Sequence, residues 1–243
     1  VSNVPESLCG GVFWSLDPND FDEFVNSVGK SLKGTEDFEE SNVPAGEAVP
    51  LADPLVGGVA NLDPANGFGF PNGLVETNLI IQSNITPGPA PLAVNPSGDP
   101  AALFVIGQGF AGSNSRKVGE DLFVQGIHAS LDLIFTESNH SGIGFELARL
   151  SGNALAGWQI AVYDKNDALI GVFPVAPPPA TEPGKVFFGI WSPDTIGRIN
   201  VYDEAGPAPD AVDNIQMWVG GDTRQITWYA GQSCIEDGGA VDC

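Results

Sequence analysis

The chain is a series of short segments in which apolar and polar residues alternate, separated by Gly, Pro, Asn and Asp. A period of two is typical of strands with one buried face. The pattern predicts strands at 35–41, 48–51, 73–83, 101–107, 121–135, 143–150, 157–164, 168–173, 185–191, 196–203, 212–218 and 224–229. Strands of this number and spacing predict an all-β fold, an antiparallel β-sandwich (jelly roll), over residues 35–230.

Turn residues shape the connections. Residues 42–73 are dense in Gly, Pro and Asn and predict a long surface excursion, and the Pro-rich residues 86–100 predict a loop. Residues 164–167 (Asp-Lys-Asn-Asp) lie between two apolar runs and predict a hairpin turn, since Asn and Asp tolerate left-handed conformations.

One stretch near the N-terminus has a helical period instead. Its apolar residues recur three and four positions apart: Phe21, Phe24, Val25, Val28 and Leu32. Asp17 before Pro18 matches a helix start, and Gly34 is placed to end the helix. Residues 1–34 are therefore predicted as an N-terminal helical extension. We expect the Phe face to pack on the sandwich; the alternative is a helix that binds a partner.

Composition and charge narrow the function classes. The net charge is −22, from 31 acidic and 9 basic residues, and 42% of residues are hydrophobic, enough for a real core. A strongly negative chain repels nucleic-acid phosphates and anionic lipid, so we do not expect this protein to bind nucleic acid. No apolar run of 18 residues is present, so no membrane span is expected. The first residue, Val1, predicts a processed, secreted chain, although a trimmed chain would begin in the same way.

Three cysteines occur, Cys9, Cys234 and Cys243. They allow one disulfide and one remaining thiol, or a bond to another chain. The C-terminal tail, 231–243, is Gly-rich and acidic, and a tether would order it. A Cys234–Cys243 bond is the preferred prediction, and a bond from Cys9 to the tail is the alternative.

Asp213 interrupts the strand-like run 212–218. A carboxylate there lowers β-propensity and must lose hydration, so it needs a partner. In so acidic a chain the sequence suggests a bound cation. The acidic residues of 36–40 are further oxygen donors, and calcium takes six to eight oxygen ligands. Calcium is therefore the predicted cofactor.

Two short motifs also resemble a known group of proteins. Residues 37–39 (Asp-Phe-Glu) and 212–215 (Val-Asp-Asn-Ile) are similar to the paired first and last strands of secreted bacterial jelly-roll domains. These include carbohydrate-binding modules of the galactose-binding-like type and exported PEP-CTERM-type β-sandwich proteins. Residues 163–164, 187–190 and 196–199 resemble their central strands.

The resemblance implies a structural calcium ion shared by the first and last strands. Carried over by position, Glu39 and Asp213 would be ligands, with Glu36, Asp37 and Asn214 as further candidates. It also implies a location outside the cell or on its surface. Two features depart from the pattern of these domains: the chain continues past residue 219, and a helix precedes residue 35. These departures concern the predicted sugar binding more than the predicted fold.

Aromatic residues suggest a ligand. Trp191 precedes a turn, and Trp228 and Tyr229 fall in an alternating segment. Such side chains stack on the apolar faces of pyranose rings, which makes a polysaccharide or cell-surface glycan the predicted partner. The alternative for each of them is burial in the core, the usual place of large aromatic side chains.

Catalysis has little support in the sequence. The histidines are His128 and His140, and neither a Gly-x-Ser-x-Gly nor a His-Glu-x-x-His motif occurs. Acid pairs remain open, because separation in space rather than in sequence defines them. The function predicted first is an extracellular, non-catalytic glycan-binding module with a structural calcium ion. A structural protein of the cell surface that self-assembles is the second prediction, and a secreted hydrolase is the third.

Overall fold

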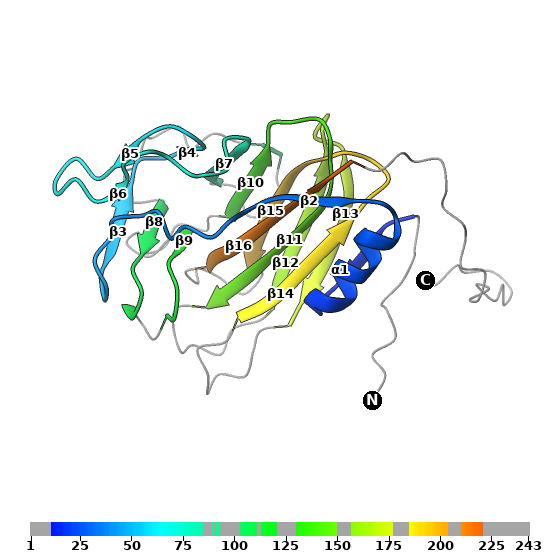
Figure 1. The fold of residues 1–243 in the computed structure, drawn as a ribbon, viewed down its shortest axis with the longest axis horizontal. Coiled ribbons are helices and arrows are strands. Elements are labelled where there is room, and N and C mark those ends of the chain that lie inside the picture. The colour runs from blue at the N-terminus through cyan, green and yellow to red at the C-terminus, as the bar shows by residue number, and fades with distance from the viewer. Residues whose placement is uncertain are drawn as a thin grey trace, which may run out of the picture.

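A computed structural model describes residues 11–84, 89, 91–92, 103–110, 113–120, 130–149, 157–176, 185–203 and 210–220. Figure 1 shows two sheets facing each other with one helix against the outside of one of them. The fold is an antiparallel β-sandwich with a short helix, so the predicted fold class is confirmed.

The first sheet has eight strands. In order they are β1 (Phe13–Ser15), β14 (Lys185–Trp191), β11 (His140–Arg149), β16 (Asp210–Val219), β9 (Lys117–Glu120), β8 (Leu103–Ile106) and β3 (Ala48–Leu51), with β2 (Ser31–Glu36) paired to β16. The second sheet has six: β13 (Leu169–Val175), β12 (Trp158–Asp164), β15 (Ile196–Asp203), β10 (Ser130–Phe135), β7 (Leu79–Asn84) and β4 (Leu55–Val56). A small ribbon joins β5 (Asn61–Leu62) to β6 (Gly69–Phe70).

The core lies between the sheets because one face of each strand is apolar. Phe145 and Leu147 of β11 meet Ile199 and Val201 of β15 in one buried cluster. The intervening residues face outward, as the period of two requires. Consecutive strands β15 and β16 lie in opposite sheets.

Strand β2 pairs with β16, with Glu36 opposite Ile215. An early strand and the last described strand are therefore neighbours, as the sequence predicted. Their bounds differ from the prediction, because β2 covers Ser31–Glu36 and ends before Phe38, which has a φ of 60°. Residues 31–34, expected in the helical extension, belong to the sandwich.

Helix α1 (Pro18–Ser27) begins where the sequence predicted: the Asp17 side chain accepts a hydrogen bond from the Asn19 N–H at 2.8 Å. It ends earlier than predicted because Gly29, with a φ of 74°, reverses the chain. The helix packs its apolar face on the eight-stranded sheet, with Phe21 and Val25 fully buried. Of the two interpretations of its Phe face, packing on the sandwich is confirmed.

His140, at the start of β11, is fully buried beside Phe135, with Lys33 and Glu137 as its charged neighbours. Burial lowers its pKa, and Lys33 acts in the same direction. In the unfolded chain a histidine takes up a proton near pH 6.5, whereas folded His140 does so only at lower pH. We expect His140 to make folding less favourable as the pH falls below about 6.5.

The measurement is urea unfolding of the wild type and of His140→Gln between pH 7.5 and 5. Subtracting the two curves removes the contribution of the carboxyl groups. A difference in unfolding free energy that does not change with pH would show that His140 keeps an ordinary pKa.

Candidate functional site

Asp213 lies on the outer face of the eight-stranded sheet, at an irregularity of β16. Val212 and Ile215 both point into the core although they are three residues apart. The extra residue is accommodated by a register shift against β11 and by Asn214, whose φ is 50°. The bulge thus leaves Asp213 and Asn214 outside the core, between Val212 and Ile215.

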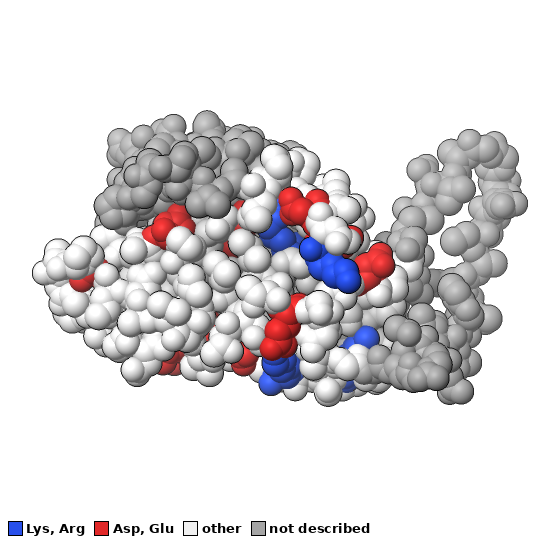
Figure 2. Space-filling model, turned by 90° about the horizontal axis from the view of Figure 1, so that it is seen from above, with Lys and Arg blue, Asp and Glu red and all other residues white. Residues whose placement is uncertain are grey.

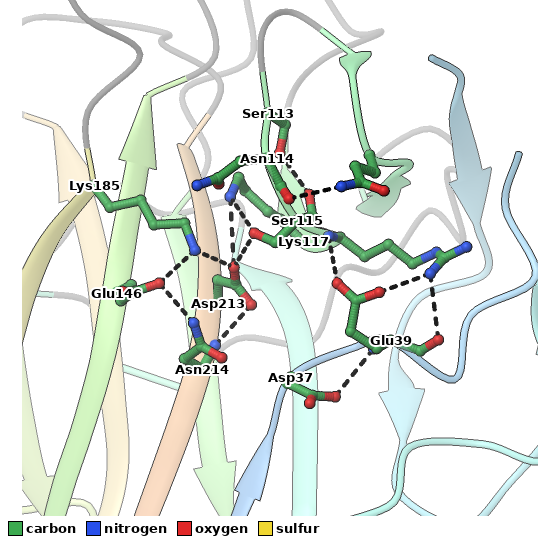
Figure 3. A network of polar contacts seen from close by, with 12 residues as sticks. Asp37, Glu39, Ser113, Asn114, Ser115, Lys117, Glu146, Lys185, Asp213 and Asn214 are labelled. Atoms are coloured by element: carbon green, nitrogen blue, oxygen red, sulfur yellow. Dashed lines mark hydrogen bonds and ion pairs between the residues drawn. The ribbon is translucent and has the colours of Figure 1, made fainter. Parts of the chain in front are cut away.

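The positive charge opposite Asp213 comes from two lysines (Figure 3). The Lys185 Nζ lies 2.7 Å and the Lys117 Nζ 3.5 Å from Asp213 Oδ2. The Ser115 hydroxyl donates to the same oxygen at 2.5 Å. Lysines from β9 and β14 therefore supply positive charge to Asp213, which the overall acidity of the chain did not suggest, and calcium binding at Asp213 stays a prediction.

The same network includes Glu146 of β11. Its carboxylate accepts hydrogen bonds from Lys185 at 2.5 Å and from the Asn214 amide at 2.7 Å. Burial lowers the pKa of Lys117, which is nearly inaccessible to solvent. Burial also acts against the charge of Lys185, but hydrogen bonds to Asp213 and Glu146 prevail and raise its pKa. Asn214, a predicted calcium ligand, is thus engaged in this network.

Glu39, the other main predicted ligand, is paired with Arg116. The guanidinium lies 2.7 Å from Glu39 Oε2, and the Arg116 backbone N–H donates to Oε1 at 3.1 Å. In Figure 3 Asp213 faces Lys117 and Lys185, and Glu39 lies apart from these lysines. The structure therefore provides each of these two carboxylates with its own basic partner.

A different acidic cluster has the oxygens close together. Oxygen atoms of Glu36, Asp37 and Glu40 lie within 4.8 Å of one another. Glu36 is fully buried and accepts hydrogen bonds from the backbone N–H groups of Phe38 at 3.1 Å and Glu76 at 3.0 Å. Burial, together with the Glu40 carboxylate, raises the pKa of Glu36 to about 7. The sequence placed Glu40 in the acidic stretch 36–40, but only Glu36 and Asp37 of this cluster were among the predicted calcium ligands.

Glu40 adds an observation that bears on a ligand. Both of its carboxylate oxygens are buried and neither has a hydrogen-bond partner. The left-handed conformation of Phe38 turns the chain so that residues on both sides of it face the same place. An all-oxygen set of three carboxylates suits a hard cation such as calcium.

The outer face of the eight-stranded sheet also carries a half-exposed row of mixed side chains. We call it the outer strip, and it consists of Glu146, Lys185, Phe187, Asn214 and Gln216. Gly144 forms its floor: a Cβ there would lie 2.9 Å from the Phe187 ring and 3.0 Å from Gln216 Oε1. Gln216 Oε1 is buried and has no hydrogen-bond partner. The strip therefore combines an aromatic ring, two amides and an ion pair on one surface.

Of the predicted sugar-stacking residues, Trp191 lies within the described part of the chain. Trp191 is only 4% exposed and packs under α1 with Phe13 and Phe21. The reason is the Phe face of the helix, which covers this end of the sheet. The predicted sugar-stacking residues Trp228 and Tyr229, and the cysteines Cys9, Cys234 and Cys243, lie outside the described residues.

The outer face of the six-stranded sheet carries a second polar cluster, which is buried. Arg198 donates to Asp132 at 2.8 Å and stacks on the Tyr163 ring at 3.8 Å. Asn200 and Asn84 also donate to Asp132, at 2.7 and 2.9 Å. Burial raises the pKa of Asp132, and Arg198 opposes that shift. This cluster reads as structural, since its charges are paired and hidden from solvent.

Charged groups are dispersed over the described part of the face drawn in Figure 2. Figure 2 shows acidic groups in several separate places on one face, some of them beside a lysine or arginine. Among the described residues no helix has the length and hydropathy needed to span a membrane.

Comparisons with known proteins give only distant structural similarities. No family model matches the chain, and no curated protein matches it. Among solved structures, the K3 cleaved adhesin domain of Lys-gingipain from Porphyromonas gingivalis is 16% identical, with a TM-score of 0.40, over 79% of this chain and 100% of that one. A variant of a family 29 carbohydrate binding module is 12% identical, with a TM-score of 0.34, over 58% of this chain and 93% of that one.

Proposed function

We propose that the protein is an extracellular, non-catalytic β-sandwich module that binds glycans through the outer strip and holds a structural calcium ion at Glu36, Asp37 and Glu40. The observation that carries the glycan part is the strip itself. Its side chains offer donors and acceptors for sugar hydroxyls beside a half-exposed phenylalanine ring. Such a combination is typical of sites that orient a ligand with few polar groups.

The unpaired Gln216 oxygen supports this proposal. A buried amide oxygen without a donor destabilises the ligand-free surface by about 1–3 kcal/mol, and a sugar hydroxyl can supply the missing donor. The Glu146–Lys185 pair and the Asn214 amide lie on the same face. Self-assembly at the cell surface is the alternative function from the sequence, and no described contact speaks for it over glycan binding.

The test is an array of immobilised polysaccharides, including cellulose, xylan, glucomannan and pectin. We expect the wild type to bind at least one class. Asn214→Gly keeps the left-handed backbone but removes the amide, and we expect about tenfold weaker binding from the loss of about 1.4 kcal/mol. Absence of binding to every polysaccharide, both by the wild type and by Phe21→Ala, in which the packing of α1 on the sheet is weakened, would refute the proposal.

The calcium part rests on the buried, unpartnered oxygens of Glu40 beside Glu36. We expect the melting temperature in millimolar calcium to be about 5–10 °C higher than in excess EDTA. A ligand at about 100 times its dissociation constant adds about 2.7 kcal/mol, and 1 kcal/mol moves the melting temperature of a chain of this size by about 2–4 °C.

A matched pair of variants locates the ion. Glu40→Gln removes one carboxylate from the cluster, whereas Glu47→Gln removes an exposed one elsewhere. We expect the calcium shift to disappear in the first and to persist in the second. Equal melting of the wild type in calcium and in EDTA would show that the cluster holds no ion, and glycan binding would then be judged on the array alone.

A further inference from the structure

The interface between α1 and the eight-stranded sheet contains unpaired polar groups that ordinary helix packing does not explain. The indole N–H groups of Trp191 and Trp218 are both buried and have no hydrogen-bond acceptor. The two residues are only 4% and 5% exposed. Buried donors without acceptors are rare in folded proteins and destabilise the state that contains them.

Both tryptophans are covered by the apolar face of α1. The Phe21 ring meets the Trp218 ring edge-on, with centroids 6.3 Å apart, and Phe24 meets Trp191 at 5.5 Å. Gly189 makes the close approach possible, because a Cβ there would lie 2.4 Å from Phe21 Cγ. In Figure 1 the helix lies across β14 at one end of the sheet.

The covered surface is continuous with the outer strip. Phe187 belongs to both surfaces. The centroid of its ring lies 5.8 Å from that of the Phe21 ring, and the same ring lies over Gly144 beside Gln216. Without α1 the sheet would present Trp191, Trp218 and Phe187 in one aromatic surface next to the polar groups of the strip. Indole faces accept the C–H faces of sugars, and indole N–H groups donate to hydroxyl oxygens.

From this arrangement we infer that α1 is a displaceable cover over the aromatic half of a saccharide site, which Trp191 and Trp218 form together with the outer strip. This inference rests on the proposed glycan binding. A saccharide would give the two indole donors the acceptors that α1 does not provide. Helix α1 has ten residues, too few to be stable alone in water, so it would unfold when it leaves the sheet.

A cover of this kind lowers the apparent affinity by the fraction of molecules in which it is open. Phe21→Ala weakens the docking of α1 and leaves the sheet surface unchanged. Phe68→Ala is the matched control, because it truncates a half-buried ring outside the cover. Val25→Ala is a milder second variant in case Phe21→Ala does not fold.

The measurement is native affinity electrophoresis in gels that contain hydroxyethylcellulose, xylan, glucomannan or pectin. We expect Phe21→Ala to bind at least one of them about tenfold or more tightly than the wild type, Val25→Ala to show a smaller gain, and Phe68→Ala none. In the wild type, hydrogen exchange of residues 18–27 should accelerate when that polysaccharide is added.

The outcomes separate the two proposals. Wild-type binding that Asn214→Gly weakens, with no gain in Phe21→Ala and unchanged exchange of 18–27, would overturn the cover and leave glycan binding standing. Failure of the wild type and of both helix variants on every gel would overturn both.

Discussion

Replacing Asp213 by alanine is expected to destabilise the protein by about 3–5 kcal/mol, because it leaves a buried lysine without its counter-charge. Lys117 is 3% exposed and Asp213 1% exposed, so solvent screens their interaction little. Lys185 forms an ion pair with the same carboxylate, and without that carboxylate its charge would repel Lys117. Urea unfolding at pH 7 measures the loss.

Two further measurements distinguish this account from calcium binding at Asp213. We expect Asp213→Ala to lose the same stability in calcium and in EDTA, since lysines rather than an ion balance the carboxylate. Adding Lys117→Met should restore about 1–3 kcal/mol, because the double variant no longer buries an unpaired charge. If Asp213→Ala instead loses stability only in calcium-containing buffer, and Lys117→Met restores none of it, a bound calcium ion is the partner of Asp213.

Replacing Arg198 by alanine should also destabilise the protein by about 3–5 kcal/mol at pH 7, because it leaves a buried carboxylate without its cation. Asp132 is fully buried, and Arg198 is the cation that contacts it at 2.8 Å. Burial already raises the pKa of Asp132, and loss of Arg198 would raise it further. Chemical unfolding as a function of pH measures both consequences.

The direction of the pH dependence follows from linkage. In Arg198→Ala the folded state would bind a proton at Asp132 at a higher pH than the unfolded chain does, so acidification favours folding. The deficit relative to the wild type should therefore shrink between pH 7 and about 4. Arg198→Lys keeps the charge and should lose less. A deficit that stays constant with pH would mean that Asp132 is not left ionised and unpaired.

Several elements could be predicted from sequence because their determinants are local. Strand β14 has the predicted bounds, Lys185–Trp191, and the predicted hairpin corresponds to β12 and β13. The helix start at Asp17 followed from a single capping side chain. The helix end was misplaced, since Gly29 stops α1 although apolar residues continue in helical register.

The partners of the site residues could not be predicted, because they depend on contacts distant in sequence. Asp213 was correctly recognised as a carboxylate that needs a partner. Which partner it has depends on Lys117 and Lys185 lying on β9 and β14, in the same sheet as β16. Glu40 lay in the predicted acidic stretch 36–40, but its approach to Glu36 could not be predicted, because the turn at Phe38 leaves no periodic signal.

The burial of Trp191 illustrates the same limit. Its place near a turn suggested exposure, and the helix was expected to pack somewhere on the sandwich. Phe24 of the helix packs on this tryptophan, and Gly189 leaves the room that Phe21 needs beside it. The predicted calcium ion and the predicted secretion of the protein remain predictions, as do the bond between Cys234 and Cys243 and the roles of Trp228 and Tyr229.

The most direct test of the central claim compares two glutamine variants on the polysaccharide that the wild type binds best. Gln216→Ala removes an amide from the outer strip, and Gln159→Ala removes a half-buried amide from β12 in the other sheet. Affinity electrophoresis should show about tenfold weaker binding for Gln216→Ala and wild-type binding for Gln159→Ala. Equal binding by the two variants would contradict a glycan site on the outer face of the eight-stranded sheet.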